Sequence, residues 1–213
     1  MALDRPRRLF VAGATGATGR VLVRLAREAG SPVVPQVRPK SAARAPEQAR
    51  IVDLADHAAL VGALSDCTTV LQLIGTTRRR FSTGDTYEAS DVGTTRQLVD
   101  AAHEAGVDHL VLLSSVGAGR PRGAYLKAKS QAEALVRASG LDWTIFRPSM
   151  FVGEEHEPPR LVVALADRLA PAKYRPIRVA QLARALLHAG LARAPLQAVL
   201  EGRALWDEVA RAG

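Results

Sequence analysis

The sequence has a single cysteine, Cys67, and few aromatic residues, which make up 4% of its 213 residues. One cysteine excludes a disulfide framework and a cysteine-based zinc site, and so few aromatic rings argue against a protein that stacks on single-stranded nucleic acid. No segment approaches the roughly 20 consecutive apolar residues of a membrane span. The N-terminus enters an apolar run at 9–12 without the hydrophobic region of a signal peptide, so we expect a cytoplasmic protein.

Basic residues outnumber acidic ones by 29 to 21, which gives a formal net charge of +8. Only four of the 29 are lysine and alanine is abundant, which is more typical of a compositional bias than of a nucleic-acid-binding surface. An acidic stretch at 154–157 contains one histidine, but no second ligand stands at metal-binding spacing. We expect a small-molecule substrate, no metal, no nucleic acid and no membrane, in a monomer or homodimer.

Short apolar runs alternate with helical patterns along the chain. Because the runs are apolar throughout rather than at every second residue, they predict an α/β fold with a doubly wound parallel sheet covered by helices on both faces. Pro35 indicates an irregular or edge-like second strand. The expected strands are 9–12, 33–37, 51–52, 70–74, 110–113, 143–146 and 198–200, and the expected helices are 21–29, 56–64, 85–105, 125–139, 161–169, 179–187 and 205–210.

The whole chain is expected to form one domain, 1–213. The pattern loosens after Pro148, and about 65 residues are few for an independent core. Residues 149–213 are therefore interpreted as a small substrate-side cap packed on the sheet.

Three glycines, Gly13, Gly16 and Gly19, stand between the first expected strand and its helix. In that context the first glycine permits a tight turn, the second lets the backbone approach a pyrophosphate, and the third allows the helix to pack closely on the strand. The helix N-terminus adds N–H groups and a partial positive charge. A glycine-rich turn without a ligand is the alternative, but the surrounding strand and helix favour nucleotide binding.

The residues after the second strand bear on the choice of nucleotide. An NAD site places an acid there to bind the ribose 2′-hydroxyl, whereas this sequence has Arg38 and Lys40 and no acid before Glu47. Two cations suit a 2′-phosphate, so NADP is favoured and NAD stays possible. The plainer alternative is that Arg38 is one more surface arginine.

Tyr125 and Lys129 are spaced i, i+4 at the start of a helix and therefore share one face. A phenol is a poor acid–base group at neutral pH, but a neighbouring ammonium favours its ionised form. Ser114 and Ser115 end the preceding strand, where a serine hydroxyl can bind a carbonyl or alcohol oxygen. This combination is suited to hydride transfer.

The chain resembles the atypical short-chain dehydrogenases/reductases of the NAD(P)-binding Rossmann superfamily. It is most similar to the small oxidoreductases related to the human Tat-interacting protein and to bacterial proteins of the NAD-dependent epimerase/dehydratase type. A later segment, 174–179, is similar to the one that closes the pocket in this group. The motifs that carry the resemblance are 13–19, 52–54, 73–77, 113–118, Tyr125 with Lys129, and 146–149.

The resemblance implies a Rossmann-like fold and a role for each matched residue. Ser115, rather than Ser114, would act with Tyr125 and Lys129 in catalysis, and Lys129 would also reach the cofactor ribose. The cofactor contacts implied are Gly13, Thr15, Gly16, Ala17, Thr18 and Gly19 at the pyrophosphate, Arg38 and Lys40 at the adenosine phosphate, Asp53 and Leu54 beside the adenine, Gly75 and Thr76 at the ribose, and Pro148, Ser149, Met150 and Phe151 at the nicotinamide.

We expect an NADP(H)-dependent oxidoreductase that transfers hydride to or from a small carbonyl or alcohol substrate. Two alternatives stay open. One is a non-catalytic protein that senses NADP(H) and regulates a partner. The other is a sugar-nucleotide epimerase or dehydratase, which uses the same tyrosine and lysine.

Overall fold

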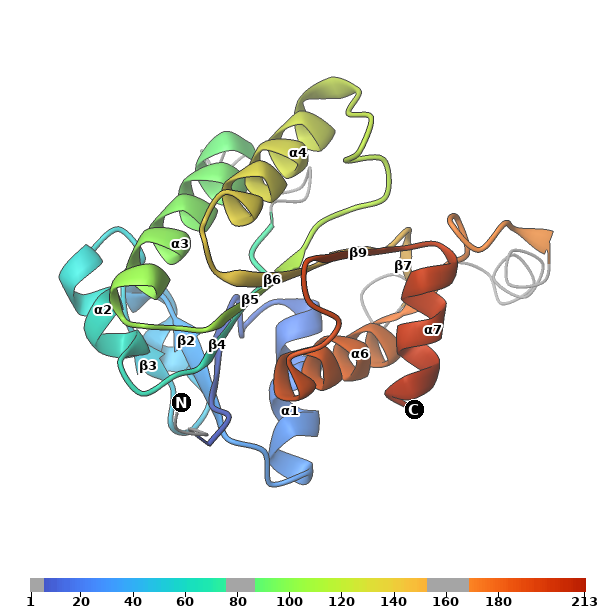
Figure 1. Ribbon diagram of the computed structural model, residues 1–213. Helices are drawn as coiled ribbons and strands as arrows, with labels where there is room; N and C mark the ends of the chain where they lie inside the picture. The colour runs from blue at the N-terminus through green and yellow to red at the C-terminus, as the bar shows by residue number, and fades with distance from the viewer. Residues whose placement is uncertain (1–5, 76–86, 153–168) are drawn as a thin grey trace.

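The computed structural model describes residues 6–75, 87–152 and 169–213. Seven parallel strands form the central sheet in the order β3-β2-β1-β4-β5-β6-β9 (Figure 1). Their bounds are β1 Leu9–Ala12, β2 Val33–Val37, β3 Arg50–Ile51, β4 Thr69–Gln72, β5 His109–Leu113, β6 Asp142–Arg147 and β9 Ala198–Glu201. The strand order reverses between β1 and β4, which is the point where open α/β sheets bind their ligands.

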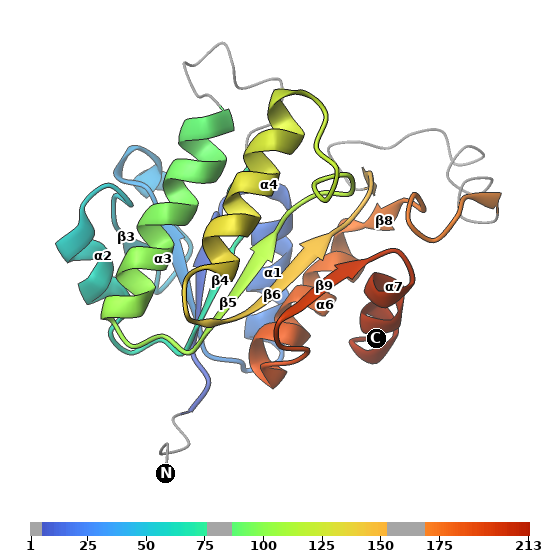
Figure 2. The same ribbon diagram turned by 45° about the horizontal axis from the view of Figure 1, so that its top comes forward.

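Helices cover both faces of the sheet, as Figures 1 and 2 show. One face carries α1 (Ala17–Glu28), α6 (Val179–Ala192) and α7 (Arg203–Arg211). The other carries α2 (His57–Leu64), α3 (Thr94–Glu104) and α4 (Gly123–Arg137). The shorter elements are a 3₁₀ helix at Pro39–Arg44, a π-helix at Glu88–Gly93, and the paired strands β7 (Phe151–Val152) and β8 (Ile177–Arg178).

Alternation along β1 shows why apolar residues fill the whole strand. Leu9 and Val11 pack in the cluster beneath α1 and α6, whereas Phe10 and Ala12 pack in the cluster beneath α2, α3 and α4. All four side chains are fully buried. A strand that is covered on both faces has no solvent-exposed side, so apolar residues are favoured at every position. The predicted doubly wound parallel sheet is therefore confirmed.

Several boundaries differ from the expected ones. The helix after the glycines begins at Ala17 rather than 21, and the fourth strand ends at Gln72 rather than 74. The single helix expected at 85–105 is a π-helix followed by α3, while residues 85 and 86 lie outside the described residues. Most of the helix expected at 161–169 also lies outside them.

The second strand is edge-like only in its first half. On one side it pairs with β1 from Val33 to Pro35, but β3 pairs with it only from Gln36 onward. Pro35 thus stands before the stretch that pairs with β3, where its missing N–H is tolerated.

The segment 149–213 contributes directly to the main sheet and its core. Its strand β9 pairs with β6, and α6 packs along α1. Its role as a cap over a substrate stays a prediction, since residues 153–168 lie outside the described part of the chain. Among the helices of the described residues, none is both long and apolar enough to cross a membrane.

Candidate functional site

The glycine-rich segment forms the corner between β1 and α1. Gly13 adopts a φ of +89°, and the Gly16 N–H donates to the Gly13 carbonyl at 3.0 Å. A Cβ at Gly19 would lie 2.2 Å from the Gly13 oxygen, so only glycine lets α1 approach the strand this closely. The structural roles predicted for the first and third glycines are thus met.

The start of α1 has the features of an anion site. Gly16 is the N-cap residue and provides no side-chain cap, and the first turn contains no acidic residue. The N–H groups that begin a helix lack intrahelical partners, and they attract a negative group such as a diphosphate. The corner therefore fits the pyrophosphate of a dinucleotide, while Thr15, Ala17 and Thr18 as contacts stay predictions.

Beyond the corner, the end of β4 lies against a buried ion pair. Lys129 Nζ is 2.6 Å from Asp91 Oδ1, and it also donates to the Leu113 carbonyl at 3.1 Å. The two side chains are only 6% and 1% exposed. A Cβ at Gly75 would lie 3.1 Å from Lys129 Nζ. An ammonium has three donor hydrogens, so these two contacts leave one without a partner among the described residues, and its contact with a cofactor ribose stays a prediction.

The sequence analysis missed Asp91. It belongs to the π-helix at Glu88–Gly93, which packs against α4, and π-helical turns occur frequently at functional sites. A buried lysine needs a paired carboxylate. The available signal was an acidic residue inside the pattern 85–105, but the sequence did not show which helix would face Lys129.

Tyr125 lies one turn before Lys129 on α4. Its half-buried ring makes an edge-on contact with Tyr87, with 5.3 Å between centroids, and Lys129 Nζ lies 6.0 Å from its centroid. The predicted i, i+4 arrangement is thus present.

The two serines after β5 have different environments. The Ser114 hydroxyl is buried and donates to Glu133 Oε1 at 2.6 Å. Among the residues that the structure describes, the half-buried Ser115 hydroxyl has one partner, the Val116 carbonyl at 3.4 Å. Ser114 is therefore part of the internal framework, and Ser115 is the serine that is available to a ligand.

Glu133 is the centre of that framework. Arg147 donates to it from Nε at 2.8 Å and from Nη2 at 2.6 Å, and Arg137 donates to it at 2.9 Å. Burial alone would raise the pKa of Glu133, but the hydrogen bonds from Arg147 and Ser114 outweigh burial and hold that pKa below its usual range. The carboxylate is therefore ionised, and it fixes Arg147 directly before Pro148.

The residues predicted to hold the adenosine half lie after β2 and β3. Arg38 is half-buried at the end of β2, Lys40 and Asp53 are exposed, and Leu54 is buried. The Arg38 side chain forms no ion pair with any residue that the structure describes. Because β2 runs parallel to β1, Arg38 lies at the same carboxyl edge of the sheet as the glycine corner.

The residues predicted at the nicotinamide follow β6. Pro148 is buried and accepts a hydrogen bond from Val116 N at 2.9 Å. Ser149 donates to the Arg175 carbonyl, and Met150 is 50% exposed. Phe151 starts β7, whose partner β8 lies in the segment predicted to close the pocket.

Some predicted features lie outside the described residues. Thr76 and the acidic stretch 154–157 are among them. Within the described ranges, no three histidine, cysteine or carboxylate side chains gather as metal ligands would.

Cys67 is a buried core residue, and burial raises the pKa of its thiol to about 12.

Comparison with known proteins identifies the family. Residues 13–190 match the family described as NAD(P)H-binding. Over 170 residues the chain is 33% identical to protein TIC 62, chloroplastic, of Pisum sativum, covering 66% of this chain and 32% of that protein. Over 180 residues it is 30% identical to the uncharacterized protein At2g34460, chloroplastic, of Arabidopsis thaliana, covering 73% of this chain and 62% of that protein. The chain thus spans less than two thirds of either relative.

Among solved structures, MoeE5 in complex with UDP-glucuronic acid and NAD superposes with a TM-score of 0.71. It is 25% identical, and the match covers 92% of this chain and 76% of that one. Other neighbours with the same fold include epimerases, such as the UDP-N-acetylglucosamine 4-epimerase of Bacillus cereus.

The relatives contradict the expected cytoplasmic location. Five curated relatives match, two named as chloroplastic and three as mitochondrial. The expectation rested on the lack of a signal-peptide pattern, and that lack does not distinguish cytoplasm from organelle.

Proposed function

This chain belongs to the NAD(P)H-binding family, and from that premise we propose that it is an NADP(H)-dependent oxidoreductase of the atypical short-chain dehydrogenase/reductase type. Its substrate would be a small carbonyl compound or the corresponding alcohol. The cofactor would lie across the carboxyl edge of the sheet, from Arg38 to Pro148.

One observation carries the proposal: a continuous series of contacts joins the glycine corner to the candidate catalytic tyrosine. A Cβ at Gly13 would lie 3.0 Å from Ile74 N, and the next residue, Gly75, lies against Lys129 Nζ. Lys129 in turn lies beside the Tyr125 ring. A dinucleotide held at the corner would thus reach the tyrosine past the lysine.

The roles of the side chains follow from this arrangement. A bound NADPH supplies the hydride that reduces the carbonyl carbon. The Tyr125 hydroxyl donates a proton to the carbonyl oxygen, and the Ser115 hydroxyl donates a hydrogen bond to it. Lys129, held by Asp91 and the Leu113 carbonyl, keeps its third N–H for the ribose and so orients the cofactor.

Turnover tests the proposal directly. We expect the protein to consume NADPH with at least some members of a carbonyl panel, and Tyr125→Phe to lower kcat about 100-fold. NADPH binding, measured by thermal shift, should survive this substitution because only a hydroxyl is removed. Lys127→Met is the matched control, since Lys127 is exposed on the same helix and points away from Lys129. Tight NADPH binding without turnover, unchanged in Tyr125→Phe, would favour the sensing protein instead.

The preference for NADP is supported by Arg38 and by the absence of an acid at the end of β2. The only polar side chain within that strand, Gln36, is buried and donates to the Val52 carbonyl at 2.8 Å. Arg38→Ala should weaken NADPH binding about tenfold and leave NADH binding unchanged, because only the former carries a 2′-phosphate. Arg44→Ala, an exposed arginine at the end of the 3₁₀ helix, should alter neither. Equal loss of both nucleotides in Arg38→Ala would contradict the preference.

A sugar-nucleotide epimerase is the second candidate, because the neighbour MoeE5 binds UDP-glucuronic acid and NAD. Such an enzyme regenerates its cofactor within each cycle, so the nucleotide should remain bound through purification. A purified sample that carries a stoichiometric nicotinamide nucleotide and consumes no NADPH would favour it.

A further inference from the structure

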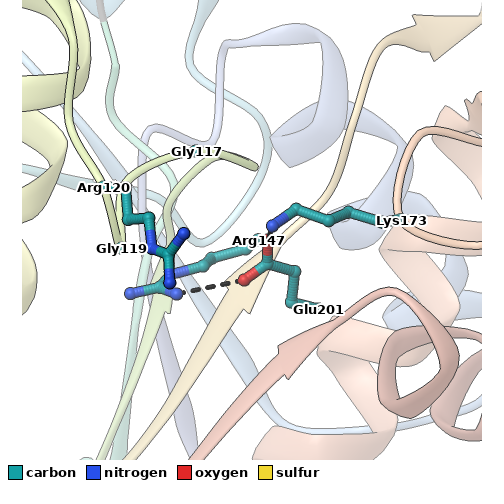
Figure 3. A pocket seen from close by; sticks show the side chains of 6 residues that line it. All are labelled: Gly117, Gly119, Arg120, Arg147, Lys173 and Glu201. Atoms are coloured by element: carbon teal, nitrogen blue, oxygen red, sulfur yellow. Dashed lines mark hydrogen bonds and ion pairs between the residues drawn. The ribbon is translucent and has the colours of Figure 1, made fainter.

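A cavity of about 470 Å³ lies where the loop after β5 meets the ends of β6 and β9. Its volume falls within the range of small-molecule sites. Figure 3 shows the residues that line it, which are Gly117, Gly119, Arg120, Arg147, Lys173 and Glu201. Two lining residues are close in sequence to the proposed reaction centre, since Gly117 follows Ser115 by two positions and Arg147 directly precedes Pro148.

Two of its three cations are already paired. Arg147 is held by Glu133 and also donates to Glu201 Oε2 at 3.0 Å, while Lys173 Nζ is 2.7 Å from Glu201 Oε1. A Cβ at Gly119 would lie 2.7 Å from Arg147 Nη1, so the loop backbone lies directly on this guanidinium. The Arg147 side chain is therefore held in one position on the side of the cavity.

Arg120 is the third cation that lines the cavity. Its side chain makes no hydrogen bond or ion pair with any residue in the described ranges. In Figure 3 its guanidinium points toward that of Arg147. Arg147 and Lys173 are paired with the carboxylates of Glu133 and Glu201, so Arg120 is the lining cation that has no carboxylate partner among the described residues.

We propose that this cavity binds an oxyanion of the substrate, a carboxylate or a phosphate, and that Arg120 is the residue that recognises it. The inference rests on the proposed function, which places the reacting carbonyl at Ser115 and Tyr125. A guanidinium binds either group through two parallel hydrogen bonds. The substrate class is thus a carbonyl compound that bears an acidic group.

Glu201 sets the position of that group within the cavity. Burial would raise its pKa, but hydrogen bonds from Lys173 and Arg147 outweigh burial and hold it low, so this side chain is a carboxylate. It repels an anion from the β9 side and directs it toward Arg120, on the side of the loop that follows Ser115.

Calorimetric titration with defined probes tests the inference. The probes are 2-oxoglutarate for the carboxylate and inorganic pyrophosphate for the phosphate, each added with NADP⁺ at saturation so that the glycine corner is filled. At least one probe should bind, and Arg120→Gln should weaken it about tenfold. Arg122→Gln is the matched control, because Arg122 is exposed two residues away and does not line the cavity. Binding of one probe alone identifies the acidic group.

Three results would overturn the inference. The first is that neither probe binds, and the second is that Arg120→Gln binds the probe with unchanged affinity. The third is an equal loss of probe affinity in Arg122→Gln, which would indicate binding by unspecific surface charge. The NADP⁺ titration of the same samples separates this outcome from a failure of the proposed function. Normal NADP⁺ binding with no anion site rejects only the cavity assignment, whereas absent NADP⁺ binding rejects the function itself.

Discussion

His109 is a fully buried residue of β5, and its Nε2 lies 2.9 Å from Thr144 Oγ1. Burial lowers its pKa to about 4, and the charge of Arg193 lowers it further. Between about pH 4 and the value of about 6.5 for an unfolded histidine, only the unfolded chain binds this proton. Stability should therefore fall as the pH falls through this range, by about 2 kcal/mol at pH 5 from this group alone.

The measurement is urea unfolding at pH 7 and pH 5. His109→Gln keeps a polar side chain but has no proton to bind, so its loss of stability on acidification should be smaller than that of the wild type by the stated amount. His103→Gln removes an exposed histidine of α3 and should keep the wild-type pH dependence. Equal pH dependence in the wild type and His109→Gln would show that His109 is not the group responsible.

Among individual residues, the candidate catalytic side chains could be predicted from the sequence, but the side chains that bind them could not. Tyr125, Lys129 and the two serines could be found because local spacing and a strand end define them. Asp91 and Glu133 could not, since their roles depend on packing of the π-helix against α4 and of α4 against β6. The choice of Ser115 over Ser114 rested on resemblance, whereas the structure gives a physical reason, the bond from Ser114 to Glu133.

Among the elements, the turn from β1 into α1 depends most strictly on glycine. Gly19→Ala would place a Cβ 2.2 Å from the Gly13 oxygen, so the helix must move away from the strand. We expect a loss of about 3 kcal/mol or a failure to fold. Gly16→Ala, with 3.3 Å to the same oxygen, should cost less.

Gly62→Ala is the matched control, because Gly62 is exposed within α2 and a Cβ there meets nothing within 4 Å. Alanine favours the helix by about 0.5–1 kcal/mol, so this variant should be more stable than the wild type. Urea midpoints of the three variants should follow the order of their contact distances. A Gly19→Ala variant as stable as the wild type would contradict the close approach of α1.

Element prediction succeeded where burial is continuous and failed where the element is short or unusual. Four strands of the sheet, β1, β2, β4 and β5, contain apolar runs and are buried along their whole length, so their approximate positions followed from the apolar runs in the sequence. The strands β7 and β8 have two residues each, which is too few for any periodicity. The π-helix at Glu88–Gly93 continues directly into α3, so no break in the sequence separates the two.

For the whole molecule, the C-terminal segment is bonded to the sheet at several points. The Gln197 N–H donates to the Trp143 carbonyl at 2.7 Å, and Thr144 Oγ1 donates to the Pro195 carbonyl at 2.6 Å. In addition, Thr69 Oγ1 of β4 donates to the Gly190 carbonyl of α6 at 3.3 Å. These bonds join α6 and β9 to β4 and β6, so we expect the chain to unfold in one cooperative step.

The two tryptophans test this, because Trp143 belongs to β6 and Trp206 to α7, where its Nε1 donates to the Ala172 carbonyl at 3.1 Å. Trp206→Phe leaves a reporter in the sheet, and Trp143→Phe leaves one in the C-terminal helix. Within each variant, the urea midpoint from fluorescence should coincide with the midpoint from far-ultraviolet circular dichroism, even though the substitutions shift the midpoints between variants. An earlier transition at Trp206 alone would mean that α7 detaches first, and the C-terminal segment would then be a separable unit.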